Sequence, residues 1–180
     1  MSGRASEAAI DPIVGRVRFA VLAARFNEEI SGKLLDGALS AFNTHGVPRK
    51  SVDVHWVPGS FELPQAALAL ARTRRYAGIV CVGVVIKGET PHYDYVARAA
   101  AEGIGRAALD TGVPISFGVI TALTEEQAWA RAGGAVGNRG EEAALATLQM
   151  AGWLHGIHSP RTSVGNKDVR PRRREARRGE

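Results

Sequence analysis

A glycine turn, a threonine and a histidine directly follow an apolar run in "GVVIKGETPHYDYV", residues 83–96. His92 comes just after Pro91, a residue typical of the first turn of a helix. The amino terminus of a helix disfavours the imidazolium form, which keeps a histidine there closer to neutral near pH 7. A neutral imidazole beside a pocket can transfer protons, although an isolated histidine more often only caps or packs.

The turn before the histidine, Gly88-Glu89-Thr90, has two interpretations. Exposed backbone N–H groups at a helix start, together with a hydroxyl, are suited to binding a phosphate. The alternative is an ordinary loop, with Thr90 as the N-cap and Pro91 as the first helical residue. The sequence has no Walker A motif and no G-x-G-x-x-G, which argues against nucleoside triphosphates and dinucleotides.

The chain alternates between strand-like and helix-like segments. Apolar or alternating runs predict strands at 17–26, 51–57, 78–86 and 114–120. Amphipathic segments between them predict five helices. The first spans 27–46 and stops at Gly46, the second begins with Ser60 as its N-cap, and the third runs from Thr90 to about Asp110. The fourth begins at Thr124, which forms a capping box with Gln127, and is interrupted at Gly133-Gly134; the fifth spans 138–157. This alternation indicates a parallel sheet with helices on both faces.

In such folds the ligand binds beyond the carboxyl ends of the strands. The residues that follow the four predicted strands are Phe26-Asn27, Pro58 to Glu62, Lys87 to His92, and Thr121 to Thr124. Aromatic rings, a carboxylate, hydroxyls and a histidine there suit a planar polar ligand beside an anion. Taken singly, Phe26, Phe61 and Phe117 would be core residues, and Arg131 and Arg139 surface charges.

The composition indicates one globular domain. The 180 residues are 45% hydrophobic and 23% charged, which argues against a disordered or membrane-embedded chain. No apolar run reaches the ~18 residues of a membrane span, and the amino terminus lacks a signal-peptide core. Cys81, the single cysteine, is interpreted as a small buried hydrophobe in a reducing, cytoplasmic setting. Trp56, Trp129 and Trp153 are assigned to packing, and no histidine spacing predicts a metal.

The charge is concentrated at one end of the chain. Residues 161–180 hold eight basic and three acidic residues, while residues 1–160 hold fifteen of each. This tail could contact nucleic acid or another acidic partner, or be a solvated end without a partner. We predict an arm at 1–13, a domain at 14–157 and a basic, disordered tail at 158–180.

Six segments together closely resemble the 6,7-dimethyl-8-ribityllumazine synthase family over roughly residues 16–155. They are "RFN" at 25–27, "PGSFELP" at 58–64, "GVVIKGETPHYDYV" at 83–96, "FGVIT" at 117–121, "EEQAWARAGG" at 125–134 and "GNRGEEAA" at 137–144. Each is modest alone, but their order and spacing are highly specific. The resemblance implies a flavodoxin-like three-layer αβα sandwich with a central four-stranded parallel sheet, whose N-terminal arm could add a strand to a neighbouring subunit.

The resemblance also implies a reaction. Such an enzyme condenses 5-amino-6-ribitylaminouracil with 3,4-dihydroxy-2-butanone 4-phosphate and releases phosphate and water, without cofactor or metal. Family members are pentamers, and some form shells of sixty subunits, which the short "AGGAVGNRG" connection favours here. Riboflavin synthase is a candidate partner.

Site roles follow from the resemblance by motif. His92 would shuttle protons, and Phe117 would come from a neighbouring subunit. The pyrimidine and ribityl chain would contact Phe26, Asn27, Ser60, Phe61, Glu62, Val85, Ile86 and Lys87. The phosphate would contact Gly88, Glu89, Thr90 and Arg131, with Arg139 at a position where the family usually has lysine.

One departure from the family pattern keeps other functions open. The family commonly has threonine and then an acidic residue or asparagine after "FGVIT", whereas this chain has Ala122-Leu123. A protein that binds flavin or lumazine without catalysis is therefore one alternative. A shell-forming protein whose tail binds nucleic acid is a second, and a flavodoxin-type electron carrier a third.

Overall fold

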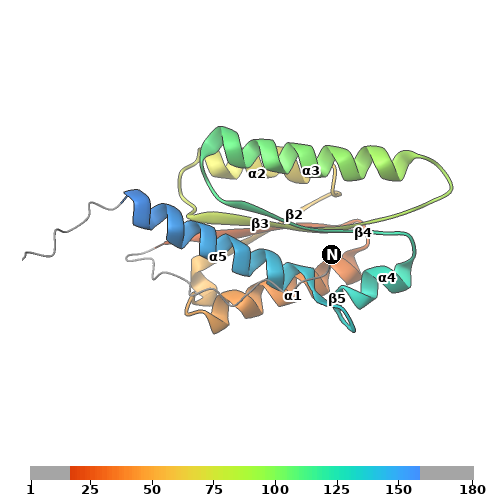
Figure 1. Cartoon of the computed structure of the whole chain (residues 1–180), viewed down its shortest axis with the longest axis horizontal. Helices are drawn as coiled ribbons and strands as arrows, with labels where there is room; N and C mark the ends of the chain where they lie inside the picture. Colours follow the sequence, from red (N-terminus) through yellow and green to blue (C-terminus); the bar gives the residue numbers. More distant parts are fainter. Residues whose placement is uncertain (1–16, 159–180) are drawn as a thin grey trace, which may run out of the picture.

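The computed structural model describes residues 17–158, which form a central sheet between two layers of helices (Figure 1). The four-stranded sheet has the order β2-β1-β3-β4, and all its pairings are parallel. Its strands are β1 (Phe19–Ala24), β2 (Val52–Val57), β3 (Gly78–Ile86) and β4 (Ile115–Ala122). The predicted α/β class, with a three-layer sandwich and a four-stranded parallel sheet, is confirmed.

Helices cover both faces of the sheet (Figure 1). One face is covered by α1 (Glu28–Thr44), α4 (Glu125–Ala130) and α5 (Arg139–His158), and the other by α2 (Leu63–Arg72) and α3 (His92–Thr111). A short 3₁₀ helix, η1 (Arg49–Ser51), precedes β2. No helix within residues 17–158 is long and apolar enough to cross a bilayer. The predicted arm at 1–13 and the predicted tail after His158 lie outside the described residues, so the domain boundaries stay a prediction; His158, predicted as the first tail residue, is the last residue of α5.

Two predicted helix starts are wrong. Thr90 is not the N-cap of α3, because Pro91 occupies that position and accepts a hydrogen bond from the Asp94 N–H at 3.0 Å. Ser60 is not the N-cap of α2, which begins after Glu62. The chain makes an extra turn after β2 and after β3 before each helix begins, and these turns leave the Ser60 and Thr90 side chains available for other contacts.

Two other helix signals, the Gly46 stop of α1 and the Thr124–Gln127 capping box of α4, are confirmed. Gly46 follows α1 with φ +81°, the left-handed conformation that favours glycine at a helix end. Thr124 accepts the Gln127 N–H at 3.3 Å, and the Gln127 side chain accepts the Leu123 N–H at 3.0 Å, which completes a capping arrangement. After α4 the chain forms a ribbon of β5 (Ala132–Gly134) and β6 (Gly137–Asn138), which the sequence interpretation did not include.

The sheet core is tightly packed around β1 and β3. Every residue of β1 is buried, as are all but the last residue of β3. Cys81 lies here fully buried, as expected, and burial raises the pKa of its thiol far above the ordinary range. Trp56 and Trp129 pack against this core, whereas Trp153 is 55% exposed, so its assignment to packing is wrong within one copy of the chain.

Asn138 joins the start of α5 to α1. Its Oδ1 accepts the backbone N–H groups of Gly140 at 2.9 Å and Glu141 at 3.2 Å, and its Nδ2 donates to the Lys33 carbonyl at 2.9 Å. The side chain therefore satisfies two helix-start donors that would otherwise lack a partner. It also fixes the position of Arg139, the next residue.

We predict that Asn138→Ala lowers the free energy of unfolding by about 1–2 kcal/mol, because it removes this cap. Denaturant titration measures the change. Asn43→Ala is the matched control: Asn43 is exposed on α1 and its side chain has no hydrogen bond among the described residues, so its stability should stay within about 0.5 kcal/mol. Equal stabilities for the two variants would contradict the capping role.

Candidate functional site

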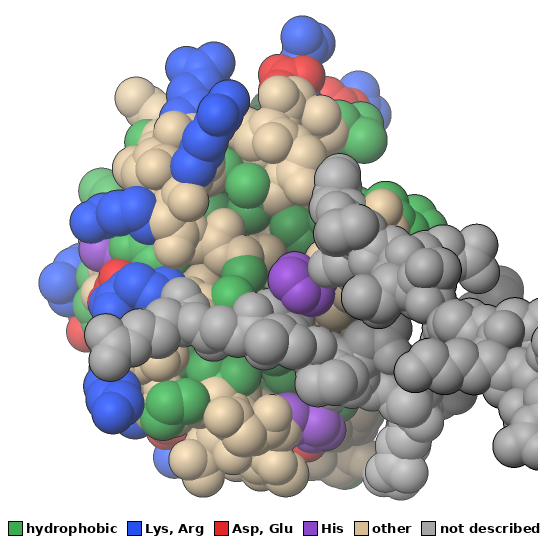
Figure 2. Space-filling view, turned by 90° about the vertical axis from the view of Figure 1, so that its left-hand side faces the viewer, with side chains coloured by type: hydrophobic (Ala, Val, Ile, Leu, Met, Phe, Trp, Pro, Cys, Tyr) green, Lys and Arg blue, Asp and Glu red, His purple; other side chains and the backbone are tan. Residues whose placement is uncertain are grey.

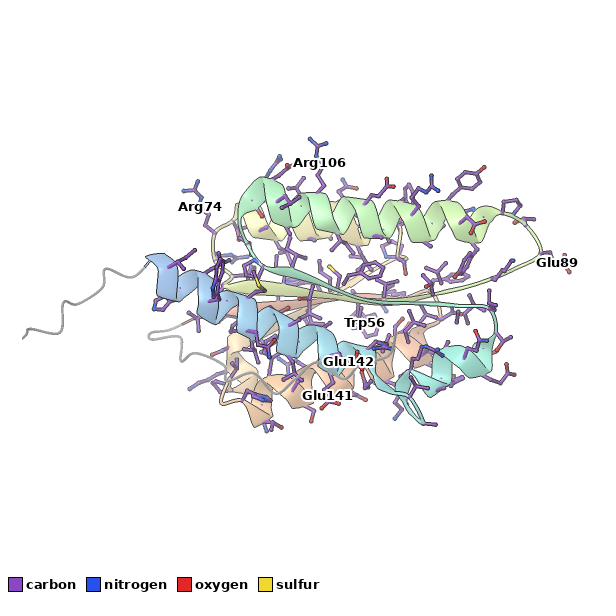
Figure 3. The ribbon with its side chains drawn as sticks, in the orientation of Figure 1. Trp56, Arg74, Glu89, Arg106, Glu141 and Glu142 are labelled. Carbon is purple, nitrogen blue, oxygen red and sulfur yellow. The ribbon has the colours of Figure 1, made fainter. Side chains whose placement is uncertain are left out.

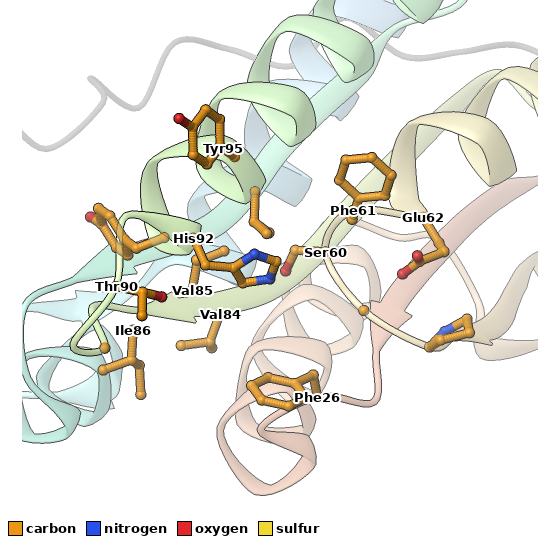
Figure 4. Close-up of a pocket in the computed structure, with 15 residues that line it drawn as sticks. Phe26, Ser60, Phe61, Glu62, Val84, Val85, Ile86, Thr90, His92 and Tyr95 are labelled. Atoms are coloured by element: carbon orange, nitrogen blue, oxygen red, sulfur yellow. The ribbon is translucent and has the colours of Figure 1, made fainter.

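A cavity of about 630 Å³ opens at the carboxyl edge of the sheet (Figure 4). It lies between the ends of β1, β2 and β3 and the first turn of α3. Its lining consists of Phe26, Pro58, Gly59, Ser60, Phe61, Glu62, Val84, Val85, Ile86, Gly88, Thr90, His92, Tyr93, Tyr95 and Val96. This volume falls within the range of ordinary small-molecule sites.

A backbone hydrogen bond joins two of the loops that form the cavity wall. The Phe26 N–H donates to the Pro58 carbonyl at 3.0 Å, which joins the loop after β1 to the loop after β2. Asn27 follows with φ 59°, a left-handed conformation in which the chain turns sharply into α1. Phe26 is left 72% exposed. A large aromatic ring so exposed at a cavity wall can stack on a planar ligand.

Ser60 contributes a buried hydroxyl to this wall. Its side chain is 4% exposed, and its Oγ has no hydrogen-bond partner. Buried polar groups are normally paired, so an unpaired hydroxyl beside a cavity is suited to a ligand. Gly83 makes room for it, because a Cβ at that position would lie 2.6 Å from the Ser60 Oγ.

His92 is the first residue of α3 and is exposed beside Ser60 at the cavity (Figure 4). The backbone N–H groups in the first turn of this 20-residue helix have no helical carbonyl partner one turn earlier. Glu62, half-buried, lies on the opposite wall (Figure 4). A proton carrier and a hydrogen-bond acceptor thus face a partly apolar space.

The cavity brings together nine of the predicted site residues. They are Phe26, Ser60, Phe61, Glu62, Val85, Ile86, Gly88, Thr90 and His92. The other predicted residues do not line it: Asn27, Lys87, Glu89, Phe117, Arg131 and Arg139. No lysine or arginine is among the lining residues, although the predicted site required cations for a phosphate.

The two predicted phosphate-binding arginines lie on the other face of the sheet. Arg131 ends α4 and donates from Nη1 to the Gln127 carbonyl at 2.9 Å. Arg139 begins α5 and forms an ion pair with Glu142, and its N–H donates to the Arg131 carbonyl at 2.9 Å. The two arginines are therefore neighbours, and within one copy the sheet separates them from His92 (Figure 1).

The sequence interpretation missed Val84, Tyr93, Tyr95 and Val96, which also line the cavity. The helical period could have indicated two of them, because residues three and four positions after His92 share its face. Ala122 and Leu123, the two residues that differ from the family pattern, do not line the cavity. Ala122 is buried in the core, and Leu123, 58% exposed, lies at the start of α4.

Within residues 17–158, no group of three or more histidine, cysteine, aspartate or glutamate side chains could hold a metal ion.

A comparison with protein families matches residues 16–155 to the model described as 6,7-dimethyl-8-ribityllumazine synthase. The match includes every residue that lines the cavity and both arginines on the other face.

We predict that Gly83→Ala lowers stability by about 1–3 kcal/mol, since the new methyl group would overlap the Ser60 Oγ and approach the Ala24 Cβ at 3.1 Å. The double variant Gly83→Ala/Ser60→Ala should recover part of the loss, as measured by denaturant unfolding. Gly105→Ala in α3 is the control, because nothing lies within 4 Å of its Cβ position. An unchanged stability for Gly83→Ala would show that Ser60 is not held there.

Proposed function

The chain belongs to the 6,7-dimethyl-8-ribityllumazine synthase family, a transferase family of riboflavin biosynthesis, and we propose that it joins 5-amino-6-ribitylaminouracil to 3,4-dihydroxy-2-butanone 4-phosphate. The product would be 6,7-dimethyl-8-ribityllumazine, with release of phosphate and water. The observation that most supports this reaction is the cavity at the sheet edge, where His92, an unpaired Ser60 hydroxyl and an exposed Phe26 ring meet.

The pyrimidine fits the inner part of this cavity best. Phe26 would stack on its ring, and Val85 and Ile86 would border it from the end of β3. The Ser60 hydroxyl and Glu62 carboxylate supply hydrogen-bond partners for the ribityl hydroxyls. Asn27 and Lys87 lie next in sequence to lining residues and would contact the ligand from the rim.

The phosphate would bind at the start of α3. Gly88, Glu89 and Thr90 precede the helix, and its free N–H groups favour an anion. A phosphate also needs cations, and none lines the cavity of one copy. We therefore propose that a second copy of the chain brings Arg131, its neighbour Arg139 and the 42% exposed Phe117 to the open side of the cavity.

This arrangement requires a homo-oligomer. A pentamer, alone or as one of twelve in a shell, is the assembly that we propose. Each contact would be heterologous, with the cavity of one copy facing the arginines of the next. Such contacts close into a ring when the rotation from one copy to the next is a full turn divided by the number of copies. We place the assembly in the cytoplasm. Riboflavin synthase stays a predicted partner.

The chemistry needs positioning and proton transfer. The uracil 5-amino group adds to the ketone and a first water leaves, which forms an imine. Elimination of phosphate then gives an enol that tautomerises to a new ketone. The ribityl-bearing nitrogen adds to this ketone and a second water leaves, which closes the ring. No step changes the overall oxidation state. Holding two substrates in reactive geometry is worth up to about 7–11 kcal/mol, whereas a general acid–base typically adds about 10²–10⁴-fold. His92, at the cavity, would move protons between these steps.

Mixing the purified protein with both substrates tests the proposal. Formation of the fluorescent lumazine together with release of one phosphate per product supports it. A protein that binds lumazine or flavin but forms no product would instead be the noncatalytic binder considered above.

We predict that His92→Ala lowers kcat by about 10²–10⁴-fold and leaves measurable turnover, because positioning does not depend on the imidazole. Steady-state kinetics measure this change. His55→Ala is the matched control, since His55 is exposed on β2 and does not line the cavity. Complete loss of turnover in a folded, assembled His92→Ala protein would contradict this division of labour.

We predict that Arg131→Ala raises KM for the phosphorylated ketone more than KM for the pyrimidine, because it removes a cation from the phosphate. An unchanged KM for the ketone would refute the assignment.

Refolding equal amounts of His92→Ala and Arg131→Ala chains together tests whether each site contains His92 of one copy and Arg131 of another. If each site uses two copies, about a quarter of sites regain both residues. No recovery in mixed oligomers would place both residues in one copy.

A further inference from the structure

Arg131 and Arg139 lie beside each other at the open end of the β5–β6 ribbon. Ala132 pairs with Asn138 in this ribbon, and the Arg139 N–H, one residue further out, donates to the Arg131 carbonyl at 2.9 Å. The segment between the two arginines, 132–138, contains no charged side chain. The ribbon therefore attaches two cations to adjacent points of the chain, although like charges on neighbouring strands repel.

Each of the two guanidinium groups is held through one atom, Nη1. In Arg131 this atom donates to the Gln127 carbonyl at 2.9 Å, and in Arg139 it forms the ion pair with Glu142. Within residues 17–158 neither guanidinium makes another hydrogen bond. A guanidinium carries donors on all three of its nitrogen atoms, so Nε and Nη2 of both arginines remain for a ligand. The Arg139 and Glu142 side chains are 35% and 37% exposed, which leaves this ion pair accessible.

The contact between Arg139 and Glu142 is not explained by the stability of α5. Arg139 is the first residue of this helix, where the helix dipole disfavours a positive charge. Two acidic residues, Glu141 and Glu142, lie in the same turn (Figure 3), but within residues 17–158 only Glu142 forms an ion pair. Asn138 already accepts the backbone N–H groups of Gly140 and Glu141. Helix capping therefore does not account for the place of the Glu142 carboxylate.

We propose that Glu142 is a positioning residue for the phosphorylated substrate. It holds one edge of the Arg139 guanidinium, and the opposite edge binds, together with Arg131, the phosphate at the cavity of a second copy. This role rests on the function proposed above, because that function supplies the phosphate. Glu142 itself contacts neither substrate and acts only through Arg139.

A carboxylate can direct an arginine in this way because of the shape of the guanidinium. The group is planar and rigid, so fixing one edge fixes the direction of the other. The ammonium group of lysine, which the family usually has in place of Arg139, is a point charge on a flexible stem and cannot be directed in this way. Two guanidinium groups and one carboxylate leave a net charge of +1, which favours an anion between the ribbon and the start of α3.

A second group of cations does not offer the same arrangement. It lies at the amino ends of the strands, on the side of the molecule that faces the viewer in Figure 2. Arg74 in this group and Glu89, which follows β3 at the cavity edge, lie at opposite ends of the molecule (Figure 3), so these cations cannot reach the phosphate site of their own copy. Arg18 uses both of its Nη atoms, because Nη2 pairs with Asp53 and Nη1 donates to the Lys50 carbonyl at 3.5 Å.

Steady-state kinetics with both substrates and calorimetric titration with inorganic phosphate test this role in the assembled protein. Glu142→Gln keeps the size of the side chain and removes its charge. Glu141→Gln is the matched control, because it removes the same charge from the same turn of α5 without breaking an ion pair. Size-exclusion chromatography and circular dichroism check that both variants fold and assemble like the unsubstituted protein.

We expect Glu142→Gln to raise KM for the phosphorylated ketone and Kd for inorganic phosphate about fivefold, the size expected for a partly exposed ion pair. KM for the pyrimidine and kcat should stay within about twofold, because only the phosphate contact is weakened. Glu141→Gln should leave all four quantities within about twofold. A purely structural role for Glu142 would not separate the two KM values.

The double variant Arg139→Gln/Glu142→Gln shows whether Glu142 acts through Arg139. We expect Arg139→Gln alone to raise Kd for phosphate about tenfold or more, since it removes charge-assisted hydrogen bonds. Adding Glu142→Gln should then change Kd by less than about twofold, because no guanidinium is left to direct.

Three results would overturn the role of Glu142. They are equal changes in Glu142→Gln and Glu141→Gln, a lower Kd for phosphate in Glu142→Gln, and a further loss of affinity in the double variant. The second result would mean that the carboxylate competes with phosphate instead of directing Arg139. Phosphate binding that depends on Glu142 in a protein that forms no lumazine would contradict the proposed function but not this role. Lumazine formation with an unchanged KM for the ketone in Glu142→Gln would contradict this role alone.

Discussion

The parallel register of β3 with β1 and β4 is the constraint on which the site depends. Between β1 and β3, Phe19 pairs with Gly78 and Ala23 with Val82; between β3 and β4, Ile79 pairs with Ile115 and Ile86 with Ala122. The strands therefore run in the same direction, and their carboxyl ends share one edge. Positions 78 and 83 of β3 require glycine, because the Thr147 side chain fills the space beside Gly78 and the Ser60 hydroxyl fills the space beside Gly83. The loops after β1, β2 and β3 meet in one cavity because these strands are parallel neighbours.

The same strand direction separates two chemical environments. At the amino ends of the strands, the segments 17–19, 45–53 and 72–78 contain six basic residues and one acidic residue. At the carboxyl ends, where the cavity opens, the segments 25–29, 58–62, 87–94 and 121–127 contain seven acidic and two basic residues. A phosphorylated substrate is therefore not attracted there by the net charge of one copy. Helix N–H groups at the start of α3 offer local compensation, but they do not replace a guanidinium. In the function that we propose, the arginines on the far face of a second copy supply the missing cations, so catalysis would require assembly.

The sequence was sufficient to predict the sheet, because continuous apolar runs such as 78–86 have few alternatives. Seven of the nine predicted lining residues follow from the rule that strand ends share an edge, whereas Val85 and Ile86 were predicted from the family resemblance. The starts of α2 and α3 were predicted wrongly, since Ser60 and Thr90 are good caps by type and only tertiary packing shows their other roles. The positions of Arg131 and Arg139 relative to the cavity could not be predicted, because motifs give order along the chain and not the face of the sheet. Trp153 was misassigned for a similar reason, since composition does not show which helical face stays uncovered.

A crystal structure of the assembled protein with inorganic phosphate and an unreactive ribitylated pyrimidine would test the central claim most directly. We predict that the pyrimidine ring stacks on Phe26 with the ribityl chain near Ser60 and Glu62, and that the phosphate lies between the start of α3 and Arg131 of a second copy. A pyrimidine bound outside this cavity, or a phosphate bound away from both His92 and every Arg131, would contradict the account.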